Sequence, residues 1–255
     1  MSDDEIEKIL KDMEKQGFPL EIKISEIIEA HGWAVANQAS YTDLETKKSR
    51  TIDILAERNV YYASNLVFDI WLCVECKKVK KPWVFYTTDI NVQIPRFQRE
   101  IISSTHFSIN KVAKKGSNFE RISKVILGSF ILQSCYSQSI FKKLAHNSFE
   151  PFTKGEGVSI HKARMQVSNM ILDLEKNVSS DTLSMITVPY LILYLPVIVV
   201  DGKVFVFQNN QLTEVEGLHY HVSYHQSSFI IDVVTAKSFE KYLSNLEQFI
   251  SNFKA

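Results

Sequence analysis

The stretch Trp71-Leu72-Cys73-Val74-Glu75-Cys76-Lys77-Lys78-Val79 decides how the rest of the chain can be arranged. It predicts a β-strand, because apolar and β-branched residues fill most of it and neither glycine nor proline interrupts it. Side chains alternate between the faces of a strand, so Glu75 and Lys77 are expected on one face and Cys76 on the other. Burying two charged side chains on such a strand costs free energy unless a partner or a bound ion compensates for it.

A second acidic residue lies in a similar setting upstream. The run Arg50-Thr51-Ile52-Asp53-Ile54-Leu55-Ala56 also predicts a strand, with apolar residues on both sides of Asp53. One acid, a gap of 22 positions (75 − 53) and then an acid-x-lysine sequence can hold a hard cation and a water molecule beside a phosphate. We therefore expect Asp53, Glu75 and Lys77 to converge in one site.

These residues carry a family resemblance. Asp53 followed by Glu75-Cys76-Lys77, after a helix that contains Glu26, resembles the motif of the PD-(D/E)xK nuclease superfamily, whose members share the restriction-endonuclease-like fold. The first third of the chain carries this resemblance well and the remainder weakly. The proline that usually precedes the first acid is absent, and Ile52 stands in its place.

The resemblance implies a metal-dependent nuclease that uses Mg²⁺ or Mn²⁺. Its catalytic residues would be Glu26, Asp53, Glu75 and Lys77, with Asp53, Glu75 and the backbone carbonyl of Cys76 as metal ligands. Lys77 would orient the attacking water and stabilise the developing charge. Two structural alternatives stay open, namely that the Asp53 cluster is a buried ion-pair network and that Glu26 is a solvated helix residue.

The expected fold class is α/β, with a restriction-endonuclease-like core in which a mixed central sheet is flanked by helices. The expected helices are residues 3–16, Pro19–His31, Val158–Glu175 as the crossover helix, and Ser238–Phe253. The expected strands are Trp33–Tyr41, Arg50–Val60, Asp69–Val79, Val188–Val200, Lys203–Gln208 and Phe229–Val234. We expect a single domain over residues 1–255.

Two segments are expected to be added to this core. Residues 83–157 are predicted to form a helical insertion, with helices near Ile94–Ser103 and Phe119–Leu127, acting as a cap over the sheet or shaping substrate access or a dimer contact. Residues 201–255 are predicted to form an α+β C-terminal extension. Within that extension, His219 and His221 are predicted to be surface residues on an edge strand.

Composition limits the partners. The chain has 29 basic and 29 acidic residues, so its formal net charge is zero and a non-specific nucleic-acid coat is not expected. Phosphate binding must then come from local groups, for which Arg50, His161 and Arg164 are candidates. The three cysteines indicate no disulfide framework. Cys73 and Cys76 form a C-x-x-C sequence without a second ligand pair, which favours packing over zinc binding.

No targeting or membrane segment is expected. The acidic start of the chain is unlike a signal peptide, and the apolar run Val188–Val200 is too short to span a bilayer. A cytoplasmic location is therefore expected. The expected substrate is nucleic acid, DNA in the first place, in microbial restriction or anti-phage defence. An RNA nuclease and a non-catalytic module that binds nucleic acid or protein remain alternatives, and a homodimer or a partner protein stays open.

Overall fold

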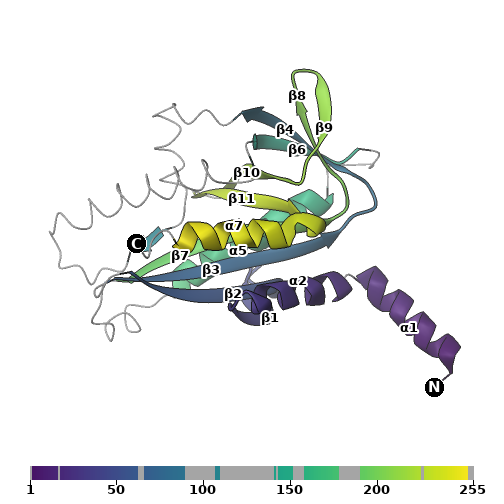
Figure 1. Cartoon of the computed structure of the whole chain (residues 1–255), viewed down its shortest axis with the longest axis horizontal. Helices are drawn as coiled ribbons and strands as arrows, with labels where there is room; N and C mark the ends of the chain where they lie inside the picture. Colours follow the sequence, from purple (N-terminus) through teal and green to yellow (C-terminus); the bar gives the residue numbers. More distant parts are fainter. Residues whose placement is uncertain are drawn as a thin grey trace.

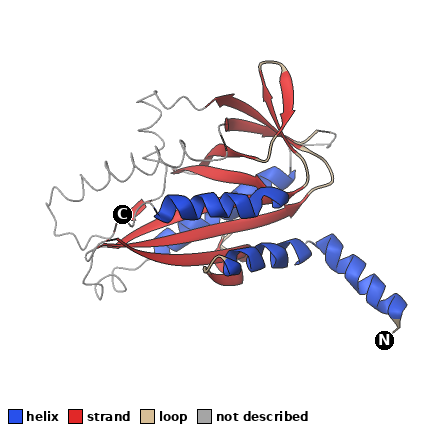
Figure 2. Cartoon of the chain, viewed as in Figure 1, coloured by secondary structure: helices blue, strands red, loops and turns tan. Residues whose placement is uncertain are grey.

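A computed structural model describes residues 2–16, 18–62, 66–89, 107–109, 141, 143–151, 158–177, 190–224 and 227–251. In these parts the chain forms one large mixed β-sheet with helices on both faces, as Figures 1 and 2 show. The strand order is β1-β2-β3-β7-β11-β10-β6-β4-β8-β9, and β5 pairs with β7. The predicted α/β class with a mixed sheet flanked by helices is confirmed.

The described residues form five helical segments and eleven strands. The helices are α1 (Asp3–Gln16), α2 (Phe18–Ala30), α5 (Val158–Asn177), the short 3₁₀ helix η2 (Ala236–Ser238) and α7 (Phe239–Ser251). The strands are β1 (Ala34–Thr42), β2 (Ser49–Tyr62), β3 (Leu66–Lys78), β4 (Trp83–Asp89), β5 (Phe107–Ile109), β6 (Lys143–Phe149), β7 (Tyr190–Asp201), β8 (Val204–Gln208), β9 (Gln211–Glu214), β10 (Gly217–Tyr224) and β11 (Ser227–Thr235). No helix in the described ranges is long and apolar enough to cross a membrane.

The first three strands form an antiparallel meander, and β7 then pairs in parallel with β3 from Val67↔Tyr190 to Lys78↔Asp201. Two parallel neighbours need a connection that crosses back over the sheet, and α5 lies in that connection. The predicted strands at 33–41, 50–60, 69–79 and 188–200 correspond to β1, β2, β3 and β7. The predicted helices correspond to α1, α2, α5 and α7.

The sheet separates two apolar cores. Helices α2 and α7 cover one face through residues such as Ile24 and Leu243, and α5 covers the other through residues such as Val167. Alternation along β3 serves both cores, because Cys76 faces α2 and α7 whereas Cys73 faces α5. Both thiols are free and buried, as expected for packing residues.

The connection from β3 to β4 runs beside the connection from β7 to β8. The Val79 N–H donates to the Asp201 carbonyl at 3.0 Å, and the Trp83 N–H donates to the Lys203 carbonyl at 2.9 Å. Gly202 is needed at this crossing, because a Cβ added there would lie 2.4 Å from Cγ2 of Val79. A side chain at position 202 would therefore force Val79 to move.

The segment expected to be a helical insertion contributes strands where the structure describes it. Its ends form β4 and β6, which pair with each other, and β5 pairs with β7. Trp83–Asp89 is rich in aromatic and β-branched residues, which favour a strand and explain β4. The helices expected near Ile94–Ser103 and Phe119–Leu127 lie outside the described residues.

The C-terminal segment is built into the central sheet. Strand β11 pairs in parallel with β7, and β10 lies between β11 and β6. The prediction that His219 and His221 are surface residues of an edge strand is therefore wrong in its edge position, and His219 is only 5% exposed. The Asp232 carboxylate bonds His219 Nδ1 at 2.6 Å and accepts from the Tyr242 hydroxyl at 2.7 Å. Strand order depends on non-local pairing, which a local pattern does not contain.

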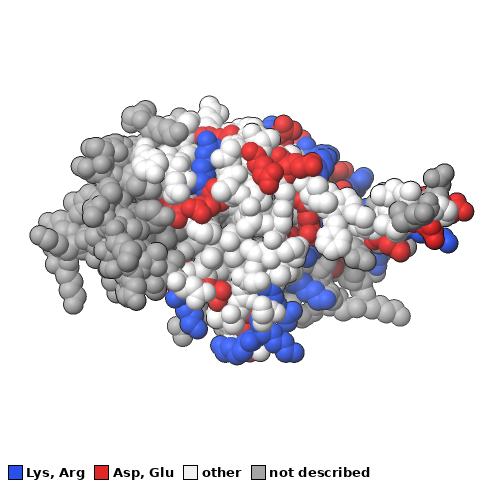
Figure 3. Space-filling model, turned by 90° about the horizontal axis from the view of Figure 1, so that it is seen from below, with Lys and Arg blue, Asp and Glu red and all other residues white. Residues whose placement is uncertain are grey.

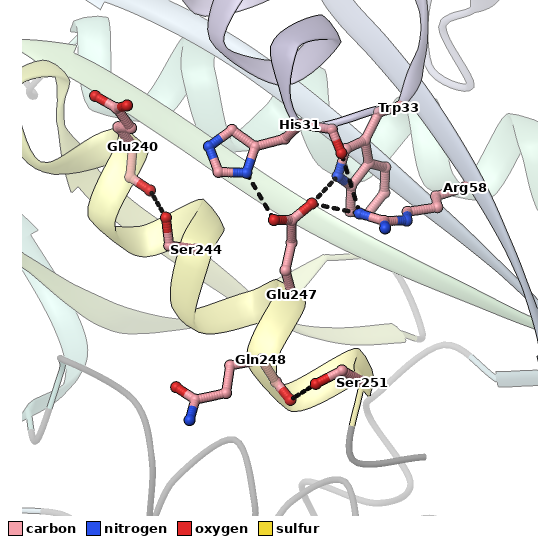
Figure 4. A network of polar contacts seen from close by, with 8 residues as sticks. All are labelled: His31, Trp33, Arg58, Glu240, Ser244, Glu247, Gln248 and Ser251. Atoms are coloured by element: carbon pink, nitrogen blue, oxygen red, sulfur yellow. Dashed lines mark hydrogen bonds and ion pairs between the residues drawn. The ribbon is translucent and has the colours of Figure 1, made fainter. Parts of the chain in front are cut away.

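A polar network fastens α7 across α2 and β2, as Figure 4 shows. The Glu247 carboxylate bonds His31 Nδ1 at 2.6 Å, accepts from the Trp33 indole N–H at 3.3 Å and forms an ion pair with Arg58. The Arg58 guanidinium also donates to the His31 carbonyl at 3.2 Å. One carboxylate thus joins the last helix to the start of the meander.

We expect Glu247→Ala to destabilise the protein by roughly 1–3 kcal/mol, because it leaves three polar partners without their acceptor. Chemical denaturation at neutral pH measures this loss. Glu240→Ala is the matched control, since Glu240 lies on the same helix with its side chain exposed. Equal effects of the two substitutions would show that the network does not hold α7 in place.

Candidate active site

The candidate site lies where β2 and β3 separate. Their ladder ends at the pair Ile54↔Val74. Beyond this pair, β2 continues with β1 as far as Ser49, and β3 continues with β7 as far as Lys78. The two strands therefore form a fork, and Asp53 is the first residue on the β2 arm.

The fork brings the three predicted residues together. The Cys76 N–H donates to Oδ2 of Asp53 at 2.7 Å, which gives this amide a partner beyond the end of the ladder. The Lys77 ammonium donates to Oε1 of Glu75 in a close ion pair. Glu75 is fully buried, and its Oε2 has no hydrogen-bond partner in the described part of the chain. A buried carboxylate oxygen without a partner is costly, so a group that bound it would stabilise the site.

Strands β1 and β2 change faces next to Asp53. On one side of this point, Val35 of β1 and Ile54 of β2 pack in the core beneath α2 and α7. On the other side, Ala39 of β1 and Ile52 of β2 pack against the α5 core. Alternate residues of a regular strand keep one face, so the change needs an irregular residue between them. That residue is Gln38, whose φ is 54°.

The helix glutamate that reaches this site is Glu21, whereas Glu26 is exposed to solvent. Five positions correspond to about 140° around a helix, so the two side chains leave α2 in different directions. Oε2 of Glu21 accepts a hydrogen bond from Nε2 of Gln38 at 2.8 Å. The expectation for Glu26 is corrected accordingly. The sequence contains a pattern that predicts the inward position of Glu21. Glu21 precedes the core residues Ile24 and Ile28 by three and seven positions, so it shares their face of the helix.

The carboxylates of Glu21, Asp53 and Glu75 lie near one ammonium group among the described residues, that of Lys77, and the pKa of each is raised. Burial raises the pKa of Glu75 to about 8; Lys77 opposes the shift and Asp53 adds to it. Burial also raises the pKa of Asp53, against the Cys76 hydrogen bond and Lys77. The pKa of Glu21 rises through burial and through the neighbouring Asp53. With Lys77 as the one ammonium recorded among them, the cluster has an excess of negative charge that a bound cation would relieve.

The donor set fits a hard divalent cation. Mg²⁺ commonly takes one or two carboxylates and keeps several waters, so it does not require a cage of side chains. Asp53 and Glu75 supply carboxylate oxygens, and the free Oε2 of Glu75 is a vacant acceptor. No group of three or more His, Cys, Asp or Glu residues in the described ranges is arranged to hold a metal ion. The fit therefore rests on two carboxylates with a main-chain oxygen and water.

Polar residues beneath the β1–β2 hairpin extend the site toward α5. Tyr41 is 3% exposed, and within the described ranges its hydroxyl has no hydrogen-bond partner. Burial and the nearby Glu75 raise the pKa of Tyr41. Oδ1 of Asn169 on α5 accepts from the Tyr224 hydroxyl at 3.1 Å and from the Leu44 N–H at 3.4 Å. Apolar spacing alone did not single out these residues.

The predicted phosphate-binding residues lie in two separate places. Arg50 donates to Asp43 at 2.7 Å and remains half exposed in the β1–β2 hairpin. His161 and Arg164 lie one turn apart near the start of α5 and share a hydrogen bond of 2.9 Å. Arg164 also donates to the Tyr220 hydroxyl at 3.2 Å. Arg50 therefore shares the hairpin end of β2 with Asp53, whereas Arg164 is directed toward β10.

Exposed lysines occupy the loops at the end of the sheet that carries the fork. Lys47 and Lys48 lie in the β1–β2 hairpin, Lys80 and Lys81 follow β3, and Lys203 follows β7. Because β2 runs antiparallel to β3 and β7 runs parallel to it, these loops share one end. Figure 3 shows basic side chains gathered along one border of the molecule despite its zero net charge.

No family model, curated protein or solved structure matches this chain. The geometry and charge of the site are therefore the observations that bear on its function.

We expect the metal-free protein to lose stability as the pH rises from about 4.5 to about 8. Glu75 has an ordinary pKa of 4.5 and a folded pKa of about 8, so the folded state retains a proton that the unfolded state releases. The loss is on the order of 5 kcal/mol once it levels off above pH 8. Thermal melts in EDTA across this range measure it.

Glu75→Gln is the matched variant for this measurement. The amide cannot titrate, so the variant should lack this part of the pH dependence and melt above the wild type at pH 8. Parallel curves for the two proteins would show that Glu75 stays ionised throughout.

Proposed function

We propose that the protein is a Mg²⁺- or Mn²⁺-dependent nuclease with a restriction-endonuclease-like core, and that its substrate is DNA. The observation that carries the proposal is the fork of β2 and β3, where Asp53 accepts from the N–H of Cys76, the residue between Glu75 and Lys77, and where the buried Oε2 of Glu75 has no hydrogen-bond partner in the described part of the chain. Hydrolysis of a phosphodiester needs positive charge on the phosphate, a positioned water and in-line attack. The residues at the fork suit these needs.

Each residue has a proposed role. Asp53, Glu75 and the carbonyl of Cys76 would hold the cation, which supplies positive charge to the phosphate and lowers the pKa of a bound water. Lys77 is a compact point charge beside Glu75, and it stabilises the charge that develops on the reacting oxygens. Glu21 adds acidic charge from α2.

The lysines of the surrounding loops support a nucleic-acid substrate. Lys47, Lys80 and Lys203 are exposed in three different loops at the end of the sheet where the fork lies. Lysine ammonium groups near a phosphate backbone release counterions, so binding should weaken as the salt concentration rises. The proposed setting is restriction or anti-phage defence in the cytoplasm, with sequence choice made by a partner or by residues 83–157.

One observation favours a second candidate function. Lys77 already contacts Glu75 in the metal-free protein, so the cluster could be a structural polar pair that serves as a scaffold. In that case the chain would be a non-catalytic module that binds nucleic acid or protein. Binding of Mn²⁺ separates the two, because the nuclease requires it and the scaffold does not.

The test is a cleavage assay on supercoiled plasmid, single-stranded DNA and RNA, each with Mg²⁺, Mn²⁺ or EDTA. We expect metal-dependent cleavage of DNA and none in EDTA. Cleavage of RNA alone would replace the DNA assignment with a ribonuclease. Calorimetry with Mn²⁺ is run beside the assay, and a protein that neither binds Mn²⁺ nor cleaves any substrate would be the scaffold.

A further inference from the structure

We propose that Gln38 is a positioning residue of this site, in which its side-chain amide holds the helix glutamate Glu21 at the strand position opposite Asp53. This inference rests on the proposed function, because Gln38 would orient carboxylates for binding a cation. Three observations on the described residues carry it: the backbone of Gln38, the contacts of its amide and the change of face that it produces.

The backbone of Gln38 is in an unusual conformation. Its φ is 54°, within β1, in the left-handed region that glycine and asparagine adopt far more readily than glutamine. Such a conformation costs free energy and persists only where the surrounding structure enforces it. Gln38 lies between two residues that pair normally with β2, namely Asn37↔Ile54 and Ala39↔Ile52. The irregularity is therefore confined to the position opposite Asp53.

The conformation directs two adjacent side chains to the same helix. The Ser25 hydroxyl donates to Oδ1 of Asn37 at 2.5 Å, and Gln38 donates to Glu21 at 2.8 Å. Ser25 and Glu21 are four positions apart on α2 and share a face. In a regular strand the side chains of Asn37 and Gln38 would point to opposite faces. The left-handed residue allows both to contact α2.

Burial raises the pKa of Asp53, and the Gln38 amide is one of the groups that oppose this rise. The side chain that binds Glu21 on α2 therefore also acts on the acid of β2 opposite it, and these two acids repel each other. Outer partners of this kind orient metal-binding carboxylates, and their removal typically weakens metal affinity or activity by about 10- to 100-fold.

Gln38→Gly separates this role from a structural one. Glycine adopts a positive φ without strain, so the backbone and the change of face are retained while the amide is lost. We expect a melting temperature no lower than that of the wild type. We also expect Mn²⁺ affinity, measured by calorimetry on the whole chain, to fall by about 10-fold. A residue with a merely structural role would not combine these two results.

Asn210→Gly is the matched control. Asn210 has a φ of 60° in the turn between β8 and β9, so this variant also places glycine at a position of positive φ but leaves the fork unchanged. This variant should bind Mn²⁺ as the wild type does. Gln38→Asn adds a second comparison, since asparagine tolerates a positive φ but its amide is one methylene shorter. Its Mn²⁺ affinity should fall as that of Gln38→Gly does.

The outcomes distinguish this inference from the proposed function. If the wild type binds Mn²⁺ and cleaves DNA while Gln38→Gly binds Mn²⁺ equally well, the positioning role is overturned and the nuclease stands. If the wild type does not bind Mn²⁺, both are overturned. A Gln38→Gly variant that melts well below the wild type would also overturn the role, because the side chain would then be needed for the fold itself.

Discussion

Lys77→Ala is expected to reduce DNA cleavage by about 100- to 1,000-fold while Mn²⁺ binding persists. A charged lysine has no lone pair, so Lys77 cannot be a metal ligand. Its contribution lies in the transition state, where it meets developing negative charge. In the metal-free protein its ammonium is paired with Glu75, which is fully buried. Removal of Lys77 therefore leaves a buried acid that a divalent cation can still neutralise.

The measurement is plasmid cleavage beside Mn²⁺ calorimetry. Lys77→Arg should also be slow, because the planar guanidinium is wider than an ammonium and does not act as a point charge. Lys78→Ala is the control, since Lys78 is the next residue of β3 and its side chain is exposed on the opposite face. Full activity in Lys77→Ala together with loss of activity in Lys78→Ala would remove the assignment of the active site to this face of β3.

Asp53→Asn is expected to abolish Mn²⁺ binding and cleavage without unfolding the protein. The amide oxygen of asparagine can still accept the Cys76 N–H, which Asp53 binds at 2.7 Å in the wild type. The substitution also removes one of three neighbouring carboxylates, and burial with Asp53 raises the pKa of Glu75 in the wild type. The metal-free variant should therefore melt at or above the temperature of the wild type.

Thermal melts with and without Mn²⁺ check this expectation. The cation should raise the melting temperature of the wild type and leave that of Asp53→Asn unchanged, because only a folded state that binds the ion is stabilised by it. A second pair of variants tests the helix acid, with Glu21→Ala affecting Mn²⁺ binding and Glu26→Ala serving as its exposed control. Should Mn²⁺ stabilise the wild type and Asp53→Asn to the same extent, Asp53 is not a ligand.

The sequence by itself determined the types of the principal elements and the pairing of the two strand acids. Unbroken apolar runs around Asp53 and Glu75 predict strands, and a period of two places Glu75 and Lys77 on one face. Strands that follow one another in the chain usually lie side by side in a sheet, which brings Asp53 near Glu75. These properties depend on residues close together in the chain, so local patterns contain them.

Only the tertiary structure decided which helix glutamate, which side of the sheet and which neighbours complete the site. Glu21 and Glu26 both precede β1, and the rotation of α2 against the sheet separates a half-buried acid from an exposed one. Nothing in the local sequence requires a positive φ at Gln38; packing against α2 and the change of face impose it. The interior position of β10 likewise arises because it pairs with β6, which lies far away in the chain, as well as with its sequence neighbour β11. Such choices depend on the burial gained by the whole fold, which no single stretch of sequence contains.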